Sequence, residues 1–342
     1  MCISAKQLAF LTALLLGAGC RQVLGINEVL GTSWSEVTPE ETSPAPRNSH
    51  DLAYDAARDR VVLFGGRSED SNRLGDTWEW DGSSWSQVSP SADDPPARRN
   101  HALAYDAARE RVVLFGGLGE GGEELGDTWT WDGTSWRDVT PDEGAPAARQ
   151  GLALAYDAAR ERVVLFGGFE EPVNYFRDTW VWDGEAWDEV TPPSDSPTAR
   201  ESHALTYDAV RDRVVLFGGS DTPLSLVNDT WEWDGEAWSE VTPAGASPEA
   251  RGLHALTYDP TRGRAVLFGG LREDVLLSRL GDTWEWDGSA WAEIEPVLAS
   301  PPPRSGHALA YEGARQRVVL FGGYDGSERF ADTWLEGPAL DE

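Results

Sequence analysis

Histidine is the residue type whose placement in this chain most suggests metal or acid–base chemistry. All five histidines occupy one recurring position: His50, His101, His203, His254 and His307. Imidazole is a common metal ligand and titrates near neutral pH, so a ring of histidines could hold a metal ion. Each histidine is, however, followed on the same strand face by a leucine and a tyrosine, and Leu152 takes the position once. We therefore favour packing between repeat units, and we predict neither a metal site nor a cofactor.

Arginine recurs three residues before the same position. The six residues are Arg47, Arg98, Arg149, Arg200, Arg251 and Arg304. A ring of guanidinium groups at one mouth of a central channel could bind a carboxylate or a sugar acid through paired hydrogen bonds. The alternative is that each arginine pairs with an acidic group, because the chain contains 59 Asp and Glu residues. Both alternatives remain open, and we retain the six arginines as candidate binding residues.

An aspartate also recurs, at Asp76, Asp127, Asp178, Asp229, Asp282 and Asp332. A residue that every unit requires suits a structural partner better than a catalyst. Catalysis needs an acid and a base in different environments, which identical units do not supply. We therefore predict no catalytic residue.

Three loops depart from the repeat and carry apolar or aromatic residues where their equivalents are polar. Such residues on a loop favour a contact surface, although they could equally cap the ends of the units. The candidate binding residues in these loops are Asn174, Tyr175, Phe176, Leu276, Leu277 and Tyr324.

The element that positions these residues is a sequence repeat. Val61-Val62-Leu63-Phe64-Gly65-Gly66 recurs, with small changes, so that the first glycines fall at 65, 116, 167, 218, 269 and 322. Four spacings are 51 residues and the last is 53. Self-similarity at a fixed period predicts a repeat architecture.

One unit, residues 98–148, predicts four strands. His101 to Asp106 alternates large and small residues, and Val112 to Phe115 is an apolar run expected for a strand covered on both faces. Trp129 and Trp131 share one face of a third strand, a hairpin signal follows at Asp132, and a fourth strand begins at Trp136. Four antiparallel strands repeated radially describe a propeller blade.

The pattern resembles the kelch repeat, in which an apolar run ends in Gly-Gly and spaced aromatic residues follow, at a period near ~50 residues. The resemblance covers residues 30–342 and implies an all-β, six-bladed β-propeller of four-stranded antiparallel blades. The sixth unit lacks its fourth strand, and residues 31–39 match the missing segment. We expect this N-terminal strand to complete the last blade and close the ring, which removes an exposed edge.

The first nineteen residues predict a signal peptide, with a basic residue, a short apolar run and a small-residue exit. Leu16-Gly17-Ala18-Gly19-Cys20 resembles a bacterial lipobox, although Gly17 stands where an aliphatic residue is usual. The resemblance implies a lipid anchor at Cys20, a linker over residues 20–29 and an outer-membrane lipoprotein. Secretion to the periplasm or the exterior is the alternative.

The charge limits the class of partner. The formal net charge is −31, and Lys6 is the only lysine. An acidic surface without a basic stripe excludes nucleic acid as the expected partner, and leaves the lipid anchor as the only expected membrane contact. Cys2 and Cys20 lie in the first twenty residues, so the remaining chain must be stabilised by its core rather than by disulfides.

The resemblance implies a non-catalytic, monomeric binding module that presents loops to a protein or carbohydrate partner. The alternative that it suggests is a periplasmic mutarotase or epimerase acting on a sugar acid, to which an arginine-lined mouth would be suited. The near-identity of the units favours the binding module.

Overall fold

The computed structural model describes residues 33–39, 42–88, 91, 93–222, 225–273, 278–297 and 299–337. Met1–Gly31 and Thr32–Glu342 are separate units, and all the described residues belong to the second. The predicted signal peptide, the linker with Cys20, and the candidates Leu276 and Leu277 lie outside the described residues. The described part of the chain consists of strands and turns, and it holds no helix suited to crossing a membrane.

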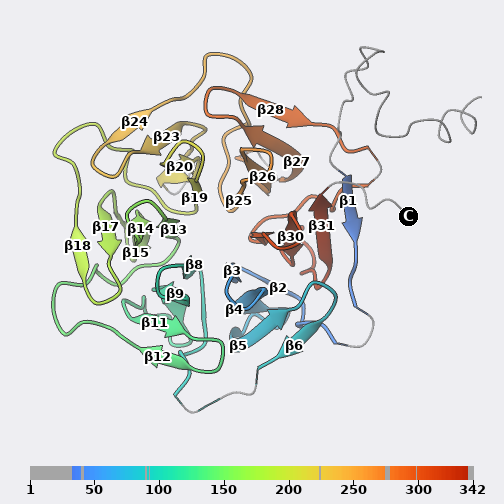
Figure 1. Ribbon diagram of the computed structural model, residues 1–342, viewed down its shortest axis with the longest axis horizontal. Helices are drawn as coiled ribbons and strands as arrows, with labels where there is room; N and C mark the ends of the chain where they lie inside the picture. Colours follow the sequence, from blue (N-terminus) through green and yellow to red (C-terminus); the bar gives the residue numbers. More distant parts are fainter. Residues whose placement is uncertain are drawn as a thin grey trace, which may run out of the picture. The chain divides into compact units, whose positions relative to one another are not determined.

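The second repeat unit illustrates how the sequence builds a blade (Figure 1). Its strands run outward from the centre in the order β8 (Ala102–Asp106), β9 (Arg111–Phe115), β11 (Thr128–Trp131) and β12 (Trp136–Asp138). All pairings are antiparallel. The apolar residues of β9 are buried on both faces, as the continuous run predicts, whereas β12 buries only its tryptophan.

The other units repeat this arrangement around the ring. The third comprises β13 (Ala153–Asp157), β14 (Arg162–Phe166), β17 (Thr179–Trp182) and β18 (Trp187–Glu189). The fourth comprises β19 (Ala204–Asp208), β20 (Arg213–Phe217), β23 (Thr230–Trp233) and β24 (Trp238–Glu240). The fifth comprises β25 (Ala255–Asp259), β26 (Arg264–Leu271), β27 (Arg279–Trp286) and β28 (Trp291–Ile294). Two short hairpins, β15 (Phe169–Glu170) with β16 (Asn174–Tyr175) and β21 (Ser220–Thr222) with β22 (Ser225–Leu226), extend from the third and fourth units.

The last unit comprises β29 (Ala308–Glu312), β30 (Arg317–Phe321), β31 (Thr333–Gly337) and β1 (Ser33–Glu36). Strand β1 pairs with β31 from Ser33↔Gly337 to Glu36↔Trp334. Trp34 is 2% exposed and packs 5.4 Å from the ring of Phe268 in the preceding unit. The N-terminal strand therefore completes the last blade, as the sequence predicts.

The first unit departs from the pattern. Its strands β3 (Asp51–Asp55), β4 (Arg60–Ser68), β5 (Arg73–Trp80) and β6 (Trp85–Gln87) pair in the expected order, but within a seven-stranded sheet. The additional strands are β2 (Arg47–Asn48), β7 (Arg98–Arg99) and β10 (Leu118–Gly119). The prediction of six four-stranded blades is therefore wrong: five sheets of the described residues are four-stranded blades, and the first unit belongs to the larger sheet.

The hairpin of the first unit extends past its glycine pair and pairs with additional strands there, whereas the similar extension of β26 and β27 in the fifth unit leaves a four-stranded sheet. Strands β4 and β5 continue past the glycine pair, with a register shift between Phe64 and Gly66, to the pair Arg67↔Arg73. The extension brings β4 beside β2 and β5 beside β7. In units two to four, the second strand ends at the phenylalanine that precedes the glycines.

The core lies between adjacent blades. Trp136 of the second unit packs 5.3 Å from Phe64 of the first, and its indole N–H donates to Thr77 Oγ1 at 2.9 Å. Elsewhere in the ring, equivalent tryptophans donate the same indole N–H hydrogen bond to a threonine Oγ1 of the preceding unit, at 2.9 Å. These contacts satisfy the polar end of each indole while its apolar body is buried.

The glycine pair is required by backbone geometry. Gly65 and Gly66 have φ angles of 66° and 106°. A Cβ at Gly65 would lie 2.8 Å from the carbonyl oxygen of Arg98, and one at Gly66 would lie 2.9 Å from Cβ of His50. Glycine is the residue that permits both the positive φ and the close approach.

Candidate functional site

The recurring arginines lie inside the protein and are ion-paired. Arg98 is fully buried, and its two terminal nitrogens donate to the two carboxylate oxygens of Asp127 at 2.6 and 2.7 Å. It also donates to the carbonyl oxygen of Gly116 at 2.9 Å, and Asp127 accepts the indole N–H of Trp129 at 2.6 Å. The same ion pair recurs as Arg47–Asp76, Arg149–Asp178, Arg200–Asp229, Arg251–Asp282 and Arg304–Asp332.

This pairing limits what the arginine ring can bind. Burial by itself raises the pKa of the Asp127 carboxyl, but the hydrogen bonds and charge of Arg98 lower that pKa below its ordinary value. The aspartate is therefore ionised at neutral pH and occupies the bidentate face of the guanidinium. A ligand carboxylate would have to displace it. Of the two alternatives open from the sequence, the structure shows internal pairing.

The histidines are buried between the blades. The ring of His101 stands edge-on to Phe64 of the neighbouring unit, with centroids 5.5 Å apart. Burial, together with the charge of Arg98, lowers the pKa of His101 to about 3, so the ring is neutral at physiological pH. Leu152 takes the same position in a cluster with Phe115. Within the described residues, no His, Cys, Asp and Glu side chains gather as a metal site would require.

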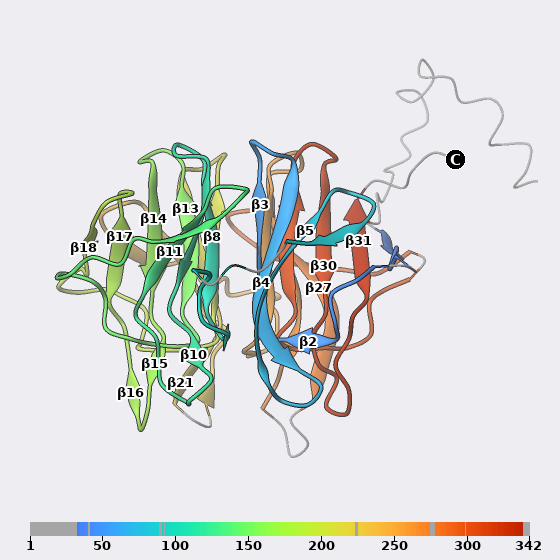
Figure 2. The same cartoon turned by 90° about the horizontal axis from the view of Figure 1, so that it is seen from below.

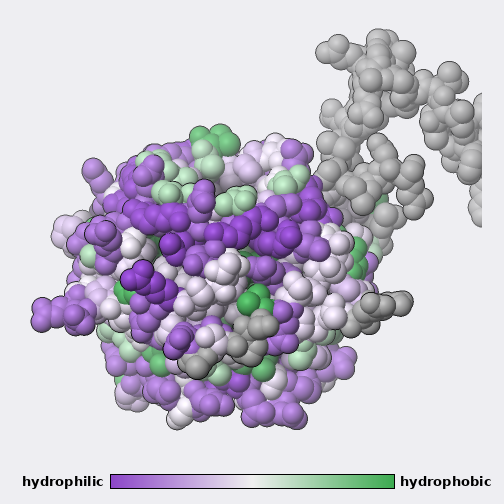
Figure 3. All heavy atoms as spheres, turned by 60° about the horizontal axis from the view of Figure 1, so that its bottom comes forward, coloured by the Kyte–Doolittle hydropathy of each residue, from purple (hydrophilic) through white to green (hydrophobic). Residues whose placement is uncertain are grey.

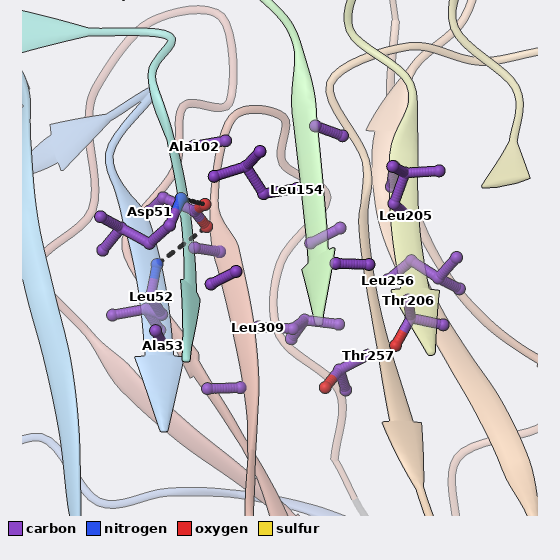
Figure 4. Close-up of a pocket in the computed structure, with 18 of the residues that line it drawn as sticks. Asp51, Leu52, Ala53, Ala102, Leu154, Leu205, Thr206, Leu256, Thr257 and Leu309 are labelled. Carbon is purple, nitrogen blue, oxygen red and sulfur yellow. Dashed lines mark hydrogen bonds between the residues drawn. The ribbon is translucent and has the colours of Figure 1, made fainter. Parts of the chain in front are cut away.

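A cavity of about 530 Å³ lies along the centre of the ring. The innermost strands β3, β8, β13, β19, β25 and β29 line it, and Figure 4 shows leucine, alanine and threonine side chains on its walls. Thr206 and Thr257 stand where the other units have alanine. The walls are thus mostly apolar.

A closed ring of backbone hydrogen bonds surrounds one end of this cavity. Each residue before the recurring histidine position donates its N–H to the carbonyl of the equivalent residue in the adjacent unit, at 2.7–2.9 Å. The residues are Ser49, Asn100, Gly151, Ser202, Leu253 and Gly306, and all have positive φ angles of 55–65°. The ring joins every unit to its neighbours at the cavity end.

Asp51 is the feature of the cavity that sequence reasoning missed. The equivalent residues are Ala102, Ala153, Ala204, Ala255 and Ala308. Among the described residues that line the cavity, Asp51 is the only Asp, Glu, Lys or Arg. Its carboxylate accepts the backbone N–H of Leu52 at 2.8 Å and of Leu103 at 2.7 Å (Figure 4), and burial raises its pKa to about 7. The replacement of alanine by aspartate at a repeat position was the signal available in the sequence.

The candidate residues of the loop 169–177 contact other residues of their own repeat unit. Phe176 lies over the guanidinium of Arg149, 3.7 Å from ring centroid to carbon, so it caps the end of its unit. Tyr175 packs 4.8 Å from Phe169, and exposed Asn174 donates to Glu170 at 3.0 Å. These residues shape a projecting hairpin.

Two arginine side chains lie near the ring of Tyr324. The guanidinium carbons of Arg279 and Arg329 each lie 5.1 Å from its ring centroid, and its hydroxyl donates to the carbonyl oxygen of Gly326 at 2.7 Å. Such contacts stabilise the loop that carries this partly buried tyrosine.

The loops between the second and third strands of the units lie on one side of the ring, which we call the loop face. It comprises the described parts of residues 67–73, 118–124, 169–175, 220–226, 271–279 and 324–329. Figure 2 shows β10, β15, β16 and β21 gathered on this side. Figure 3 shows the side of the ring and the face opposite the loop face; hydrophilic residues dominate this view, with hydrophobic residues scattered among them.

Antiparallel blades arranged around a central cavity define a β-propeller. Residues 20–219 and 206–338 match the family model described as the KLHDC2/KLHL20/DRC7 Kelch-repeats domain. The chain therefore belongs to the kelch-repeat family.

Similar proteins share the repeat but differ in total length. The chain is 28% identical to F-box/kelch-repeat protein At1g51550 of Arabidopsis thaliana, over 83% of this chain and 68% of that protein. It is 25% identical to host cell factor 1 of Rattus norvegicus, over 94% of this chain but only 17% of that protein. Among solved structures, "Structure of YjhT" superposes with a TM-score of 0.66 at 15% identity, covering 87% of this chain and 96% of that one. This last likeness concerns the fold alone.

Proposed function

We propose that the protein is a non-catalytic interaction module that binds a protein partner through its loop face. Membership in the kelch-repeat family supports this function. The observation that carries the proposal is that each repeat unit combines a constant scaffold with a variable loop. The repeated polar groups are engaged internally, as in Arg98–Asp127, while the differences between units concentrate in the loops of one face.

The enzyme alternative is not favoured. The recurring arginines and aspartates neutralise one another, and the histidines are buried; burial lowers the pKa of His203 to about 3, which favours its neutral form. Neither set supplies the solvent-accessible acid and base that sugar-acid chemistry would need. A carbohydrate ligand and a monomeric state remain predictions.

We further propose that the module is exported and anchored at a bacterial outer membrane through Cys20. The proposal is supported by the signal-like segment and the lipobox-like residues Leu16 to Cys20. Metabolic labelling with a fatty-acid analogue should modify the full chain and not a Cys20→Ser variant. Label in both proteins, or in neither, would contradict the anchor.

Site-specific photo-crosslinking in the native host tests the partner proposal. A crosslinker placed at Tyr324 or Tyr175 reports on the loop face. Val210, which is 71% exposed in the turn between β19 and β20, and exposed Arg137 on β12 provide matched controls elsewhere on the surface. We expect a discrete protein adduct from the loop-face positions alone. Equal crosslinking from all four positions, or none from the loop face, would contradict the proposal.

A further inference from the structure

Three arginines converge at the extended hairpin of the first unit: two belong to the loop face and one to the adjacent strand β7. Arg67 and Arg73 are directly opposite one another across β4 and β5, an arrangement that is unfavourable for like charges. Arg99 on β7 lies beside this hairpin. Burial lowers the pKa of Arg99, and the nearby charges of Arg67, Arg73 and Arg329 lower it further, while that of Glu201 opposes the shift.

These cations are not neutralised in the way that the recurring arginines are. Within the described residues, neither Arg67 nor Arg99 forms an ion pair, and the Nε of Arg73 is buried without a hydrogen-bond partner. The terminal nitrogen of Arg73 donates to the carbonyl oxygen of Glu120 at 3.2 Å. Among the described residues, no ion pair thus neutralises this cluster of partly buried cations, in a chain whose net charge is −31.

The cluster is specific to one part of the ring. At the position of Arg67 the other units have Leu118, Phe169, Ser220, Leu271 and Tyr324. At the position of Arg99 they have Asn48, Gln150, Glu201, Gly252 and Ser305. The blade scaffold therefore does not require arginine at either place.

An acidic group occupies the position equivalent to Arg99 two units further along. Burial raises the pKa of Glu201 to about 7, the charge of Arg99 opposes this shift, and that of Glu171 adds to it. Arg99 and Glu201 thus influence each other electrostatically, but no ion pair joins them. Arg67, Arg73 and Arg99 thus form the basic side, and Glu171 and Glu201 the acidic side, of a polarised surface on and beside the loop face.

We propose that this polarised surface binds a partner segment that presents an acidic and a basic side chain together. The acidic side chain contacts Arg67 and Arg99, and the basic side chain contacts Glu201. This inference rests on the proposed function, because it assigns the class of partner to the same face. A peptide suits the surface better than a nucleic acid, which offers negative charge only.

The energetic reason is that both sides are partly desolvated before binding. A half-buried charge without a partner is costly, and a complementary charge repays part of that cost when it docks. At an ionic strength of about 0.15 M the Debye length is about 8 Å. The ligand therefore responds to these nearby groups rather than to the net charge of the whole chain.

Labelled octapeptides provide the probe for the full-length protein. One alternates Glu and Lys, a second alternates Glu and Ser, and a third alternates Lys and Ser. We expect the Glu-Lys peptide to bind most tightly by fluorescence anisotropy. Arg99→Glu should weaken its binding about tenfold, and Glu201→Lys should do the same. Arg137→Glu and Asp188→Lys, which change exposed residues of the outer strands, should leave it unchanged.

A charge-swapped variant distinguishes binding from a structural role. Arg99→Glu combined with Glu201→Arg reverses the polarity of the surface, and an alternating peptide can bind it in the opposite direction, so affinity should recover. Equal binding of all three peptides, no peptide binding, or no effect of Arg99→Glu would overturn the inference. If crosslinking from Tyr324 still captured a protein in that case, the proposed function would stand without this assignment. The absence of any adduct would refute the proposed function itself.

Discussion

The ion pair between Arg98 and Asp127 offers a quantitative test of the structural assignment of the arginine ring. Asp127→Asn keeps the shape of the side chain but removes the charge that neutralises Arg98. Because the guanidinium is fully buried, its isolation should lower the free energy of unfolding by about 3–5 kcal/mol. Asp188→Asn, at an exposed position on β18, is the matched control and should change that free energy by less than about 0.5 kcal/mol.

Urea denaturation measures the free energy of unfolding of both variants. The 17 tryptophans report unfolding by fluorescence, and one of them, Trp129, donates a hydrogen bond to Asp127. The penalty should depend on pH with a defined sign. The pKa of Asp127 is lowered in the folded protein, so its stabilisation is present above about pH 4, the value for an unfolded aspartate. It is lost as the pH falls through the lower, folded-state pKa. An Asp127→Asn penalty below about 1 kcal/mol at pH 7 would refute the structural assignment.

Three further predictions concern closure, the glycine pair and the cavity. Trp34→Ala should lower the free energy of unfolding by about 3–5 kcal/mol, because it empties the contact that closes the ring, and unchanged urea unfolding would contradict closure by β1. Gly66→Ala should destabilise the protein by at least about 1–2 kcal/mol, because Cβ would meet His50, and an unchanged melting temperature would show that the backbone relaxes freely. Asp51→Ala should remove a pH dependence of stability. The raised pKa means that the folded protein keeps a proton on Asp51 between about pH 4 and 7, where the unfolded chain has lost it. As the pH rises through that range, the free energy of unfolding of the wild type should fall by up to about 4 kcal/mol relative to that of the variant. Parallel stability profiles for the two proteins would contradict a raised pKa for Asp51 in the cavity wall.

Most of the fold could be predicted from the sequence, because the residue pattern of each blade strand is typical of its place in the blade. Val112 to Phe115 has the composition of a doubly covered strand, and the glycine pair after it marks a backbone that other residues cannot adopt. The closure by β1 was also predictable, since residues 31–39 repeat the sequence of a fourth strand.

The seven-stranded sheet was not predictable, because it depends on which strands pair with the end of an extended hairpin. The polar loop that follows Gly66 has no strand-like alternation, yet β4 and β5 continue through it to Arg67 and Arg73. The pairing of β2 and β7 with this extension is a tertiary contact. Local sequence preference does not specify such contacts.

The candidate site was only partly predictable. Arg98 and Asp127 are 29 residues apart, and whether they meet depends on side-chain directions that spacing alone does not define. Asp51 was visible as a break in the repeat, but its importance depends on the cavity into which the inner strands bring it. Likewise, Arg67 and Arg99 become a cluster only because the extended hairpin reaches β7.

A loop exchange tests the central claim, that the loop face binds the protein partner, most directly. Residues 169–175 can be replaced by the seven residues of 118–124, which follow the same glycine pair in the preceding unit. As a control, Trp187–Glu189 on the outer strand can be replaced by Trp136–Asp138. In both variants, crosslinker at Tyr324 reports capture of the partner. We predict that capture falls in the loop exchange and persists in the outer-strand exchange; the reverse result would contradict binding through the loop face.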